Sequence, residues 1–398
     1  DHLGFGFHRY STDRQWLVPH FEKMLYDQAM HALAAIEAFQ ATGEREFAQT
    51  ARQIVAYVLR DLTAPDGGFF CGEDADSEGA EGTFYLWTEA EIRAILPPAE
   101  TAVALAAWNV TAEGNYRDES TGDYTGANIL HLGVSARDAA AQTGIAPAGA
   151  EASLEAARAA LFEARERRPR PLRDDKILAD WNGLMAAAIA RVGRVLGDPA
   201  AIDAAHRAAE LVHGSLRSAD GRLLHRAGTG PSGVPGFLDD YAFLAWAWIE
   251  LYDATLEPQH LARALELQQQ TLDLFWDDAG GGFFFTAHDS EPLLVRDKEV
   301  HDGAIPSGNS VAMANLVRLS RLTGRADLEA RADAVAAAFA RDLNAAPAAH
   351  CHLLSALQMA AGPSLEVVIA GDPRAEATRP RLAAARARDL PGAVLPLA

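Results

Sequence analysis

The sequence has little cysteine and no long hydrophobic run, and each absence excludes a class of protein. Its two cysteines, Cys71 and Cys351, are isolated from each other and from any CxxC spacing. They predict neither a disulfide framework nor redox chemistry within this chain, and they fit a reducing cytoplasm. No stretch approaches the roughly 18 uninterrupted apolar residues of a membrane span. We therefore expect a cytoplasmic protein with no membrane partner.

Positive charge is also scarce. The chain carries 35 lysines and arginines against 55 aspartates and glutamates, which gives a net charge of −20. This balance disfavours nucleic acid and anionic membranes as partners. The sequence also lacks a glycine-rich phosphate loop, a Ser/His/Asp order and a zinc spacing. We therefore expect no cofactor and no bound metal.

What the chain does contain is a unit of two helices that recurs in four copies. The copies align without gaps at the turn between their helices, at Ala41-Thr42-Gly43, Val195-Leu196-Gly197, Ala254-Thr255-Leu256 and Leu322-Thr323-Gly324. The first helix of each copy is apolar on nearly every face, whereas the second has one apolar stripe against charged residues. This difference predicts an inner and an outer layer of helices, in either an open solenoid or a closed toroid.

The connections between copies favour the toroid. The aromatic segments 67–70 and 281–285 follow second helices and predict short β-hairpins. We therefore predict an all-α fold, an (α/α) toroid of five to six helical pairs that can lack one stave. The toroid should cover residues 1–362 with an inserted loop around 109–131, and 363–398 should begin a truncated strand and helix segment. Because the chain starts at Asp1 without a methionine, we expect a fragment of a longer protein.

Polar and aromatic residues open the inner helices, which are otherwise apolar. One column of the aligned copies holds Asp27, Trp181, Asp240 and Gly308, the next holds Gln28, Asn182, Tyr241 and Asn309, and just before them stand Asp180, Asp239 and Ser307. Parallel inner helices bring their positive ends together around one depression. Each Asp, Asn or Ser alone is better explained as an N-cap. Trp181 and Tyr241 cap nothing, so the set favours a ligand pocket.

Three further clusters place ionisable side chains beside aromatic rings at the start of an inner helix. They contain His8, Arg9, Trp16 and His20; Glu73, Asp74 and Asp76 with Tyr85 and Trp87; and Lys298, His301, Asp302, Ser307 and Asn309. Rings that stack on sugar C–H faces, beside dense donors and acceptors, suit a polyhydroxylated ligand. The acidic run at Glu73–Gly79 can also be interpreted as a solvated turn or as a metal-binding loop, although it lacks the EF-hand spacing. A single histidine such as His8 or His20 is also explained as structural.

Several runs of residues carry a resemblance to a known family. They are Gly6–Ser11, Trp16–Asp27, Glu73–Gly79, Asp174–Leu178 with Asp180–Gly183, and Pro306–Ser310. These runs resemble the thioredoxin-domain-containing family, in which a thioredoxin-like domain with a CxxC motif precedes a helical domain similar to six-hairpin glycosidases and N-acylglucosamine 2-epimerase. The resemblance implies a toroid of the six-hairpin type. It also implies an upstream thioredoxin-like partner domain that is absent here, and it carries over no catalytic residue.

Two hypotheses follow for the function. The first is a carbohydrate-active enzyme of sugar metabolism, either a hydrolase that uses two carboxylates or an epimerase or isomerase that uses a histidine base, for which His8, His20 and His301 are available. The second is a non-catalytic module that binds a glycan or a protein and works with the thioredoxin-like domain. We predict Asp27, Asp240, His20 and Asp180 as catalytic residues. The predicted substrate-binding residues are His8, Arg9, Trp16, Glu73, Asp74, Asp76, Trp87, Lys176, Trp181, Asn182, Asp239, Tyr241, Asp302, Ser307 and Asn309.

Overall fold

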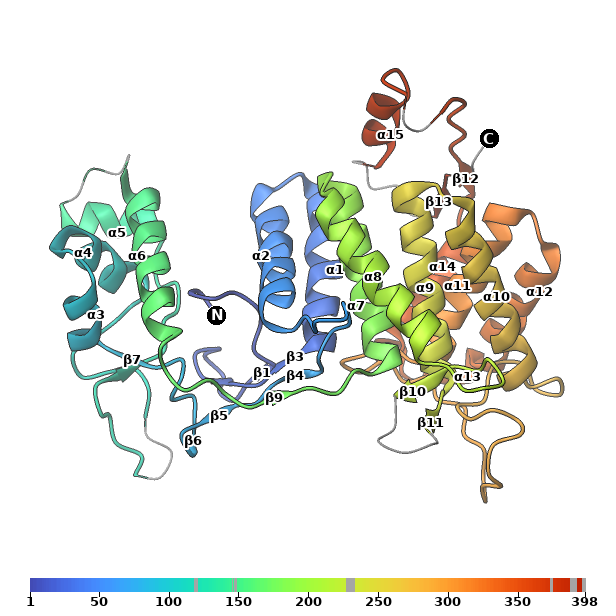
Figure 1. The fold of residues 1–398 in the computed structure, drawn as a ribbon, viewed down its shortest axis with the longest axis horizontal. Helices are drawn as coiled ribbons and strands as arrows, with labels where there is room; N and C mark the ends of the chain where they lie inside the picture. The colour runs from blue at the N-terminus through green and yellow to red at the C-terminus, as the bar shows by residue number, and fades with distance from the viewer. Residues whose placement is uncertain are drawn as a thin grey trace. The chain divides into compact units, whose positions relative to one another are not determined.

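The computed structural model describes residues 1–117, 121–144, 146, 149–226, 233–372, 375–386 and 392–395. The chain divides into two compact units (Figure 1). The first comprises Asp1–Met24 and Gly72–Asp174, and the second comprises Leu25–Cys71 and Asp175–Ala398. The domain boundaries expected from the sequence stay a prediction.

In the described part of the second unit, five helices form the inner row. They are α1 (Leu25–Thr42), α7 (Ala179–Leu196), α9 (Leu238–Thr255), α11 (Gly308–Thr323) and α14 (Cys351–Ala361). Each packs against the next in this order. Because helices flank α7, α9 and α11 on several sides, their residues are buried on most faces; in α9 every residue from Asp240 to Tyr252 is buried.

The outer helices cover the inner ones pairwise. They are α2 (Arg45–Asp61) on α1, α8 (Pro199–Ser215) on α7, α10 (Pro258–Phe275) on α9 and α12 (Ala326–Ala338) on α11, followed by α13 (Ala340–Ala345) and a short 3-10 helix (Pro347–Ala349). Each buries one stripe and exposes the other faces, as their amphipathic pattern predicts. The predicted fold class is thus confirmed for the described residues: paired inner and outer helices with only short strands.

The turn that aligns the copies has one backbone conformation. Gly43, Gly197 and Gly324 follow α1, α7 and α11 with φ of 75°, 68° and 70°, and Leu256 follows α9 with φ of 60°. A left-handed residue after the last helical turn closes the helix by a backbone hydrogen bond, and glycine adopts it without steric cost. The spacing that revealed the repeat therefore marks the ends of the inner helices.

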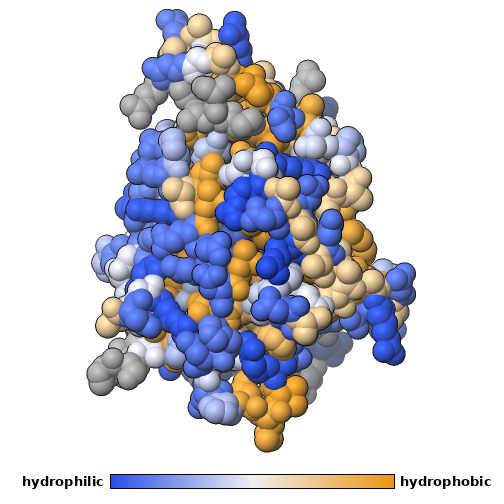
Figure 2. All heavy atoms as spheres, turned by 90° about the vertical axis from the view of Figure 1, so that its right-hand side faces the viewer, coloured by the Kyte–Doolittle hydropathy of each residue, from blue (hydrophilic) through white to orange (hydrophobic). Residues whose placement is uncertain are grey.

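Short strands and a C-terminal segment complete the second unit. Strands β10 (Leu224–Arg226) and β11 (Val234–Pro235) pair antiparallel, whereas β12 (Leu365–Glu366) and β13 (Ala393–Val394) pair parallel around α15 (Arg379–Arg386). Exposed apolar side chains lie at 293–295, between α10 and α11. Most of the face in Figure 2 is hydrophilic, with hydrophobic atoms gathered at its lower tip. No helix among the described residues is long and apolar enough to span a membrane.

The first unit combines four helices with short strands. The helices in its described residues are α3 (Glu89–Ile95), α4 (Pro98–Ala107), α5 (Ala136–Thr143) and α6 (Ala150–Arg165). Strand β4 (Gly72–Glu73) lies between β3 (Lys23–Met24) and β9 (Arg173–Asp174) and pairs with both. The other strands form pairs: β1 (Tyr10–Ser11) with β2 (Pro19–His20), β5 (Asp76–Ser77) with β6 (Ala80–Glu81), and β7 (Trp87–Thr88) with β8 (Ala127–Asn128). Trp87, Trp108 and Leu161 belong to its core.

Candidate active site

Three side chains that can exchange protons meet in the second unit, where α7 and α9 begin. Asp180 is the second residue of α7, Asp240 is the third residue of α9, and His225 lies in β10. His225 Nδ1 lies 3.0 Å from Asp240 Oδ1 and 3.9 Å from Asp180 Oδ1. Two of the three predicted catalytic aspartates therefore lie beside one histidine.

Asp240 is the fixed centre of this group. Its side chain is 0% exposed. Its Oδ1 accepts the backbone N–H of Asp180 at 2.9 Å, and its Oδ2 accepts the backbone N–H of Phe237 at 2.7 Å. These donors belong to the first turns of two helices, where backbone N–H groups lack intrahelical partners and the helix dipole favours negative charge. Asp240 thereby links α7 to α9 and orients His225.

The surroundings shift the protonation of the groups around Asp240. Burial raises the pKa of Asp180 to about 7, the charge of Asp240 adds to the rise, and His225 opposes it. The hydrogen bond with Asp240 raises the pKa of His225, with further help from the charges of Asp240 and Asp180. Asp180 can therefore donate or accept a proton near neutrality, and the pKa of His225 lies above its ordinary value.

A fourth group, Asp239, joins the start of α9 to the start of α11. Its carboxylate accepts the backbone N–H of Gly308. Burial raises its pKa well above the ordinary range, and the charges of Asp180, Asp240 and Glu299 raise it further, in that order. Asp239 therefore favours its protonated form beside the three other groups.

The donor atoms of Asp180, His225 and Asp240 all lie within 4.8 Å of one another, a spacing that could also hold a metal ion. Both oxygens of Asp240 already accept backbone hydrogen bonds. We therefore do not assign these residues as metal ligands, and the geometry favours a shared proton.

Three residues of the second aligned column, Asn182, Tyr241 and Asn309, attach hairpin segments to the starts of inner helices. Asn182 accepts the N–H of Phe69 at 2.7 Å and donates to its carbonyl at 2.9 Å, and Asn309 makes the same pair of bonds with Phe283 at 2.8 Å and 2.9 Å. Tyr241 Oη accepts the N–H of Leu223 at 3.0 Å. The recurrence of this column is thus explained by the fold, and a ligand-binding role for its members stays a prediction.

Asp302 and Ser307 lie at the beginnings of α14 and α11. The Asp302 carboxylate accepts the backbone N–H groups of Ser307 at 2.9 Å, His352 at 2.8 Å and Leu353 at 3.1 Å. Ser307 Oγ caps α11 by accepting the N–H of Ser310 at 3.2 Å. Carboxylates therefore bridge successive inner helices at α7–α9, α9–α11 and α11–α14.

The remaining predicted residues of the second unit lie along the first part of the inner row. Asp27 occupies the first turn of α1 and is 8% exposed. The rings of Tyr26 and Trp181 pack edge to face with centroids 4.8 Å apart, which joins the starts of α1 and α7. Lys176 is exposed in the segment before α7. The roles predicted for Asp27, Trp181 and Lys176 stay predictions.

Two of the histidines that the sequence offered as bases, His8 and His20, lie in the first unit and are held by neighbours. His20 Nδ1 lies 2.7 Å from Glu81 Oε1, and its Nε2 lies 3.1 Å from Glu22 Oε2, so both ring nitrogens face carboxylates. Glu22 also pairs with Arg9 at 3.0 Å. Burial lowers the pKa of His8 well below the ordinary value, which keeps this histidine neutral.

Four of the other predicted residues of the first unit differ widely in burial. Trp87 is 2% exposed in the core, and Glu73 is buried in contact with Arg170 at 3.2 Å. Asp76 is exposed, and Trp16 is 85% exposed. Asp74 accepts the backbone N–H of Asp76 at 3.3 Å in the turn between β4 and β5. Asp180, Asp239 and Asp240 thus belong to the second unit, whereas the residues just described belong to the first.

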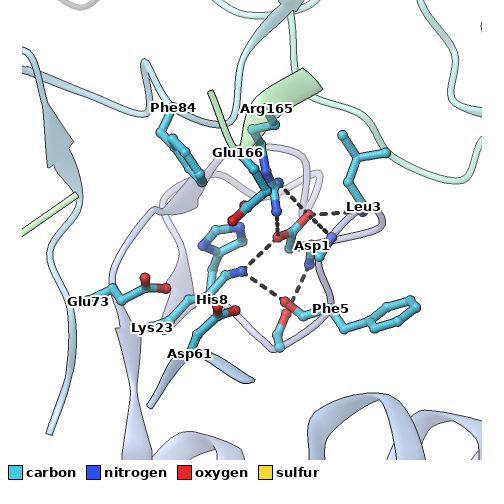
Figure 3. A network of polar contacts seen from close by, with 12 residues as sticks. Asp1, Leu3, Phe5, His8, Lys23, Asp61, Glu73, Phe84, Arg165 and Glu166 are labelled. Atoms are coloured by element: carbon cyan, nitrogen blue, oxygen red, sulfur yellow. Dashed lines mark hydrogen bonds and ion pairs between the residues drawn. The ribbon is translucent and has the colours of Figure 1, made fainter. Parts of the chain in front are cut away.

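A buried charge network anchors the beginning of the first unit (Figure 3). Lys23 is 1% exposed, and its Nζ donates to Asp1 Oδ2 at 2.7 Å and to the Phe5 carbonyl at 2.8 Å. Arg165 donates to both oxygens of Asp1 at 2.9 Å and 2.8 Å. A bidentate guanidinium and an ammonium saturate this carboxylate, so the network explains part of the segment 16–27 as structural.

Sequence reasoning missed His225. Gly67 and Gly221 occupy equivalent positions after their outer helices, and His225 follows its glycine by the same number of residues as Cys71 does. A polar ring at this hairpin position was the available signal. The pairing of β10 with β11 shifts register between Leu224 and Arg226, and such an irregularity redirects a side chain in a way that strand alternation does not predict.

Comparisons with known proteins show which sequences and structures this chain is similar to. No family model matches it. The chain is 37% identical over its full length to spermatogenesis-associated protein 20 of Homo sapiens, of which it covers 54%. Among solved structures it is similar to cellobiose 2-epimerase from Bacillus thermoamylovorans B4167, with a TM-score of 0.45, 9% identity, and coverage of 91% of this chain and 67% of that one. It is also similar to a D-mannose isomerase, with a TM-score of 0.41, 13% identity, and coverage of 83% and 78%.

The matches to curated sequences test the family resemblance that the motifs carry. The curated relatives from human, rat and mouse share one name and are each matched along this entire chain, of which the sequence motifs quoted above are a part. The resemblance is thereby confirmed: the chain is homologous over its full length to spermatogenesis-associated protein 20, and it spans about half the length of the curated relatives that it matches.

Proposed function

We propose that the chain is an acid–base enzyme that moves a proton on a sugar, as an epimerase or an aldose–ketose isomerase. One observation carries this proposal: His225 is fixed by the buried carboxylate of Asp240 and lies 3.9 Å from Asp180, whose pKa is raised to about 7. A base and an acid held side by side are what proton transfer next to a carbonyl requires.

The contacts of His225 assign the two ring nitrogens different tasks. Nδ1 is engaged by Asp240, and within the described part of the chain no hydrogen bond to Nε2 is found. The carboxylate fixes the ring orientation and stabilises the imidazolium that forms when Nε2 takes a proton. Nε2 is therefore the atom that removes the proton from the carbon beside the sugar carbonyl.

Asp180 supplies the complementary acid. As Nε2 takes the proton, the C–H electron pair forms the carbon–carbon double bond of an enediol, and the carbonyl oxygen takes a proton from Asp180. When Nε2 returns the proton to the neighbouring carbon and the hydroxyl on the first carbon gives its proton to Asp180, aldose and ketose are exchanged. Inversion at the first carbon requires the enediol to turn its other face to Nε2 before the proton returns, and the new hydroxyl gives its proton back to Asp180 as the carbonyl re-forms. Each cycle leaves His225 and Asp180 in their starting states.

Hydrolysis is less well supported by the same contacts. A retaining or inverting glycosidase needs one ionised carboxylate free to attack or to activate water, beside one acid. Asp240 is fully buried with both oxygens engaged, and burial favours the protonated forms of Asp180 and Asp239. No attacking carboxylate therefore stands out among these three groups.

The sugar class rests on the neighbourhood of the site. Trp181 directly follows Asp180, is partly exposed and offers a ring on which the C–H face of a sugar can stack. We include in the proposal that this helical part works in the cytoplasm, joined in the whole protein to a thioredoxin-like domain. Its non-catalytic alternative is a module that binds a glycan or a protein for that domain.

The test is proton exchange followed by NMR. The protein is incubated in D2O with a panel of aldoses and ketoses, and deuterium incorporation next to the carbonyl is measured together with product formation. We expect exchange with at least one sugar, lost in His225→Gln and retained in His301→Gln, which alters an exposed histidine. Binding of a sugar without exchange would support the module, and glycoside cleavage without exchange would support a hydrolase; either result contradicts the proposal.

A further inference from the structure

Gly308 is the first residue of α11, and its missing side chain leaves room for Asp239. A Cβ atom at this position would lie 2.2 Å from Asp239 Oδ1 and 2.7 Å and 2.9 Å from Leu238 Cγ and Cδ2. These distances are far inside van der Waals contact. Any other residue at position 308 would therefore push the Asp239 carboxyl away from the start of α11.

The backbone itself does not require glycine here. Gly308 is absent from the residues with positive φ, and alanine is a better helix former than glycine. The first turn of α11 would thus accept alanine if Asp239 and Leu238 lay elsewhere. The reason for a glycine in the segment 306–310 is therefore its neighbours on α9.

The place that Gly308 opens determines what surrounds Asp239. The carboxyl accepts the backbone N–H of Gly308 from α11 and faces the charges of Asp180 from α7, Asp240 from its own helix and Glu299 from the segment before α11. Apart from the N–H of Gly308, the principal neighbours are all acidic. Asp239 can relieve this crowding by holding a proton, which it can then donate to a ligand hydroxyl or carbonyl oxygen.

We propose that Gly308 is a positioning residue for the acid–base reaction, because it seats Asp239 against the first N–H group of α11 and beside Asp180 and Asp240, where Asp239 serves as a protonated donor to the ligand. This inference rests on the proposed function for the reaction. The seating itself can be measured without turnover.

The first variant is Gly308→Ala. The carboxyl should turn outward and lose its burial, which is the largest cause of its raised pKa, so the pKa of Asp239 should fall towards the ordinary aspartate value of about 4. It is measured by 13C NMR titration of the side-chain carboxyls, with Asp239→Asn to assign the signal. Gly214→Ala in α8, where a Cβ would meet nothing within 4 Å, is the matched control and should leave the titration unchanged.

The pH profile of sugar exchange is a readout that a purely structural role of Gly308 would not change. If protonated Asp239 is the active form, activity is present below its pKa and is lost as pH rises through it. Lowering that pKa must move the alkaline limb of the profile to lower pH in Gly308→Ala. In an Asp239→Ala background, Gly308→Ala should have little further effect on the profile, because the displaced carboxyl is already absent.

Several outcomes separate success from failure. An unchanged Asp239 titration in folded Gly308→Ala overturns the positioning, and so do additive effects of Gly308→Ala and Asp239→Ala on the profile. Should Gly308→Ala unfold, Leu238→Ala/Gly308→Ala removes the two Leu238 clashes and leaves the Asp239 contact to be tested in the same way. A shifted titration in a protein that exchanges no sugar would leave the seating intact and refute the proposed function instead.

Discussion

Acidic side chains lie at the starts of the inner helices α7 and α9 and again towards the end of α9, and the two places differ in what surrounds them. At the helix starts, Asp180 and Asp240 lie beside one histidine, His225, and the pKa of Asp180 is raised to about 7 by burial and by Asp240. Towards the helix ends, burial likewise raises the pKa of Glu250, but the charges of Arg318, Arg191 and Arg194 outweigh it and lower that pKa to about 2.

The contacts at the helix ends account for the difference. Arg318 from α11 donates to Glu250 and to Asp253 of α9, at 2.7 Å in each case. Arg191 of α7 pairs with Glu37 of α1 at 2.6 Å, and Arg194 lies 3.8 Å from Glu250. Burial acts in the same direction at both ends, so the partner charges decide whether a buried acid is permanently ionised or ready to exchange its proton. The first condition suits a structural tie and the second suits catalysis.

The largest effect on stability is expected when the charge balance at the helix ends is broken. Arg318→Met leaves Glu250, which is 2% exposed, and Asp253 without their main partner. We expect the free energy of unfolding to fall by about 3–5 kcal/mol, the usual cost of an uncompensated buried charge, measured by urea denaturation. Arg325→Met breaks an exposed pair with Asp327 and should leave stability nearly unchanged. Equal losses in both variants would refute the contrast.

A change at the helix starts should mainly affect chemistry. Asp240→Asn removes the charge that orients His225 and raises its pKa, so we expect a loss of sugar exchange of about 10²-fold or more and a fall in the pKa of His225, followed by 1H NMR of its ring. The matched control is Asp198→Asn, because Asp198 caps α8 through the N–H groups of Ala200 and Ala201 and asparagine caps equally well. Loss of exchange in both variants would point to a general effect of helix capping.

The two ends should also respond oppositely to pH. The folded-state pKa of Asp180 is raised, so its contribution to stability is present below the unfolded value of about 3.9 and is lost as pH rises through about 7. Asp180→Asn removes this loss and should make the protein more stable relative to wild type at pH 8 than at pH 5.

The sign reverses for Glu250. Its folded-state pKa is lowered, so its contribution is present above the unfolded value of about 4.3 and is lost as pH falls through about 2. Glu250→Gln should therefore cost stability at pH 5 and pH 8 alike, and the cost should shrink in acid. Thermal unfolding across this pH range checks both variants; the same pH trend in both would contradict the comparison.

The smallest effect is expected in the first unit. His20 is partly exposed between Glu22 and Glu81, so His20→Gln should cost roughly 0–1 kcal/mol in the free energy of unfolding and leave sugar exchange unchanged. A large loss of exchange with normal stability would return His20 to the catalytic role that the sequence suggested.

The arrangement of the helices could be predicted from the sequence, because the ends of a helix and the position of its apolar face depend on residues close together in the chain. Apolar periodicity separates inner from outer helices, and the left-handed residues at Gly43, Gly197 and Gly324 mark where the inner ones end. Alignment of the copies also identified Asp180, Asp239 and Asp240 as candidate site residues. It could not assign them a different role from Asn182 and Asn309, because the two sets stand in adjacent columns of the repeat and only the contacts separate a hairpin anchor from a crowded acid.

His225 lay beyond sequence reasoning for a different reason. Its contact with Asp240 depends on the irregular pairing of β10 and β11 and on the packing of α7 against α9. That packing requires Gly183, where a Cβ would lie 2.7 Å from the backbone of Leu244. Neither the strand irregularity nor the close helix crossing has a signature in the spacing of residues along the chain.

The most direct test of the shared-proton site is the pKa of Asp180 in the folded protein. It can be measured by 13C NMR titration of the aspartate carboxyls, with the signal assigned by its loss in Asp180→Asn. Burial and the neighbouring charge of Asp240 predict a midpoint at about 7. A midpoint near the ordinary aspartate value of about 4 would mean that the carboxyl is permanently ionised at neutral pH, and the acid–base site proposed here would be contradicted.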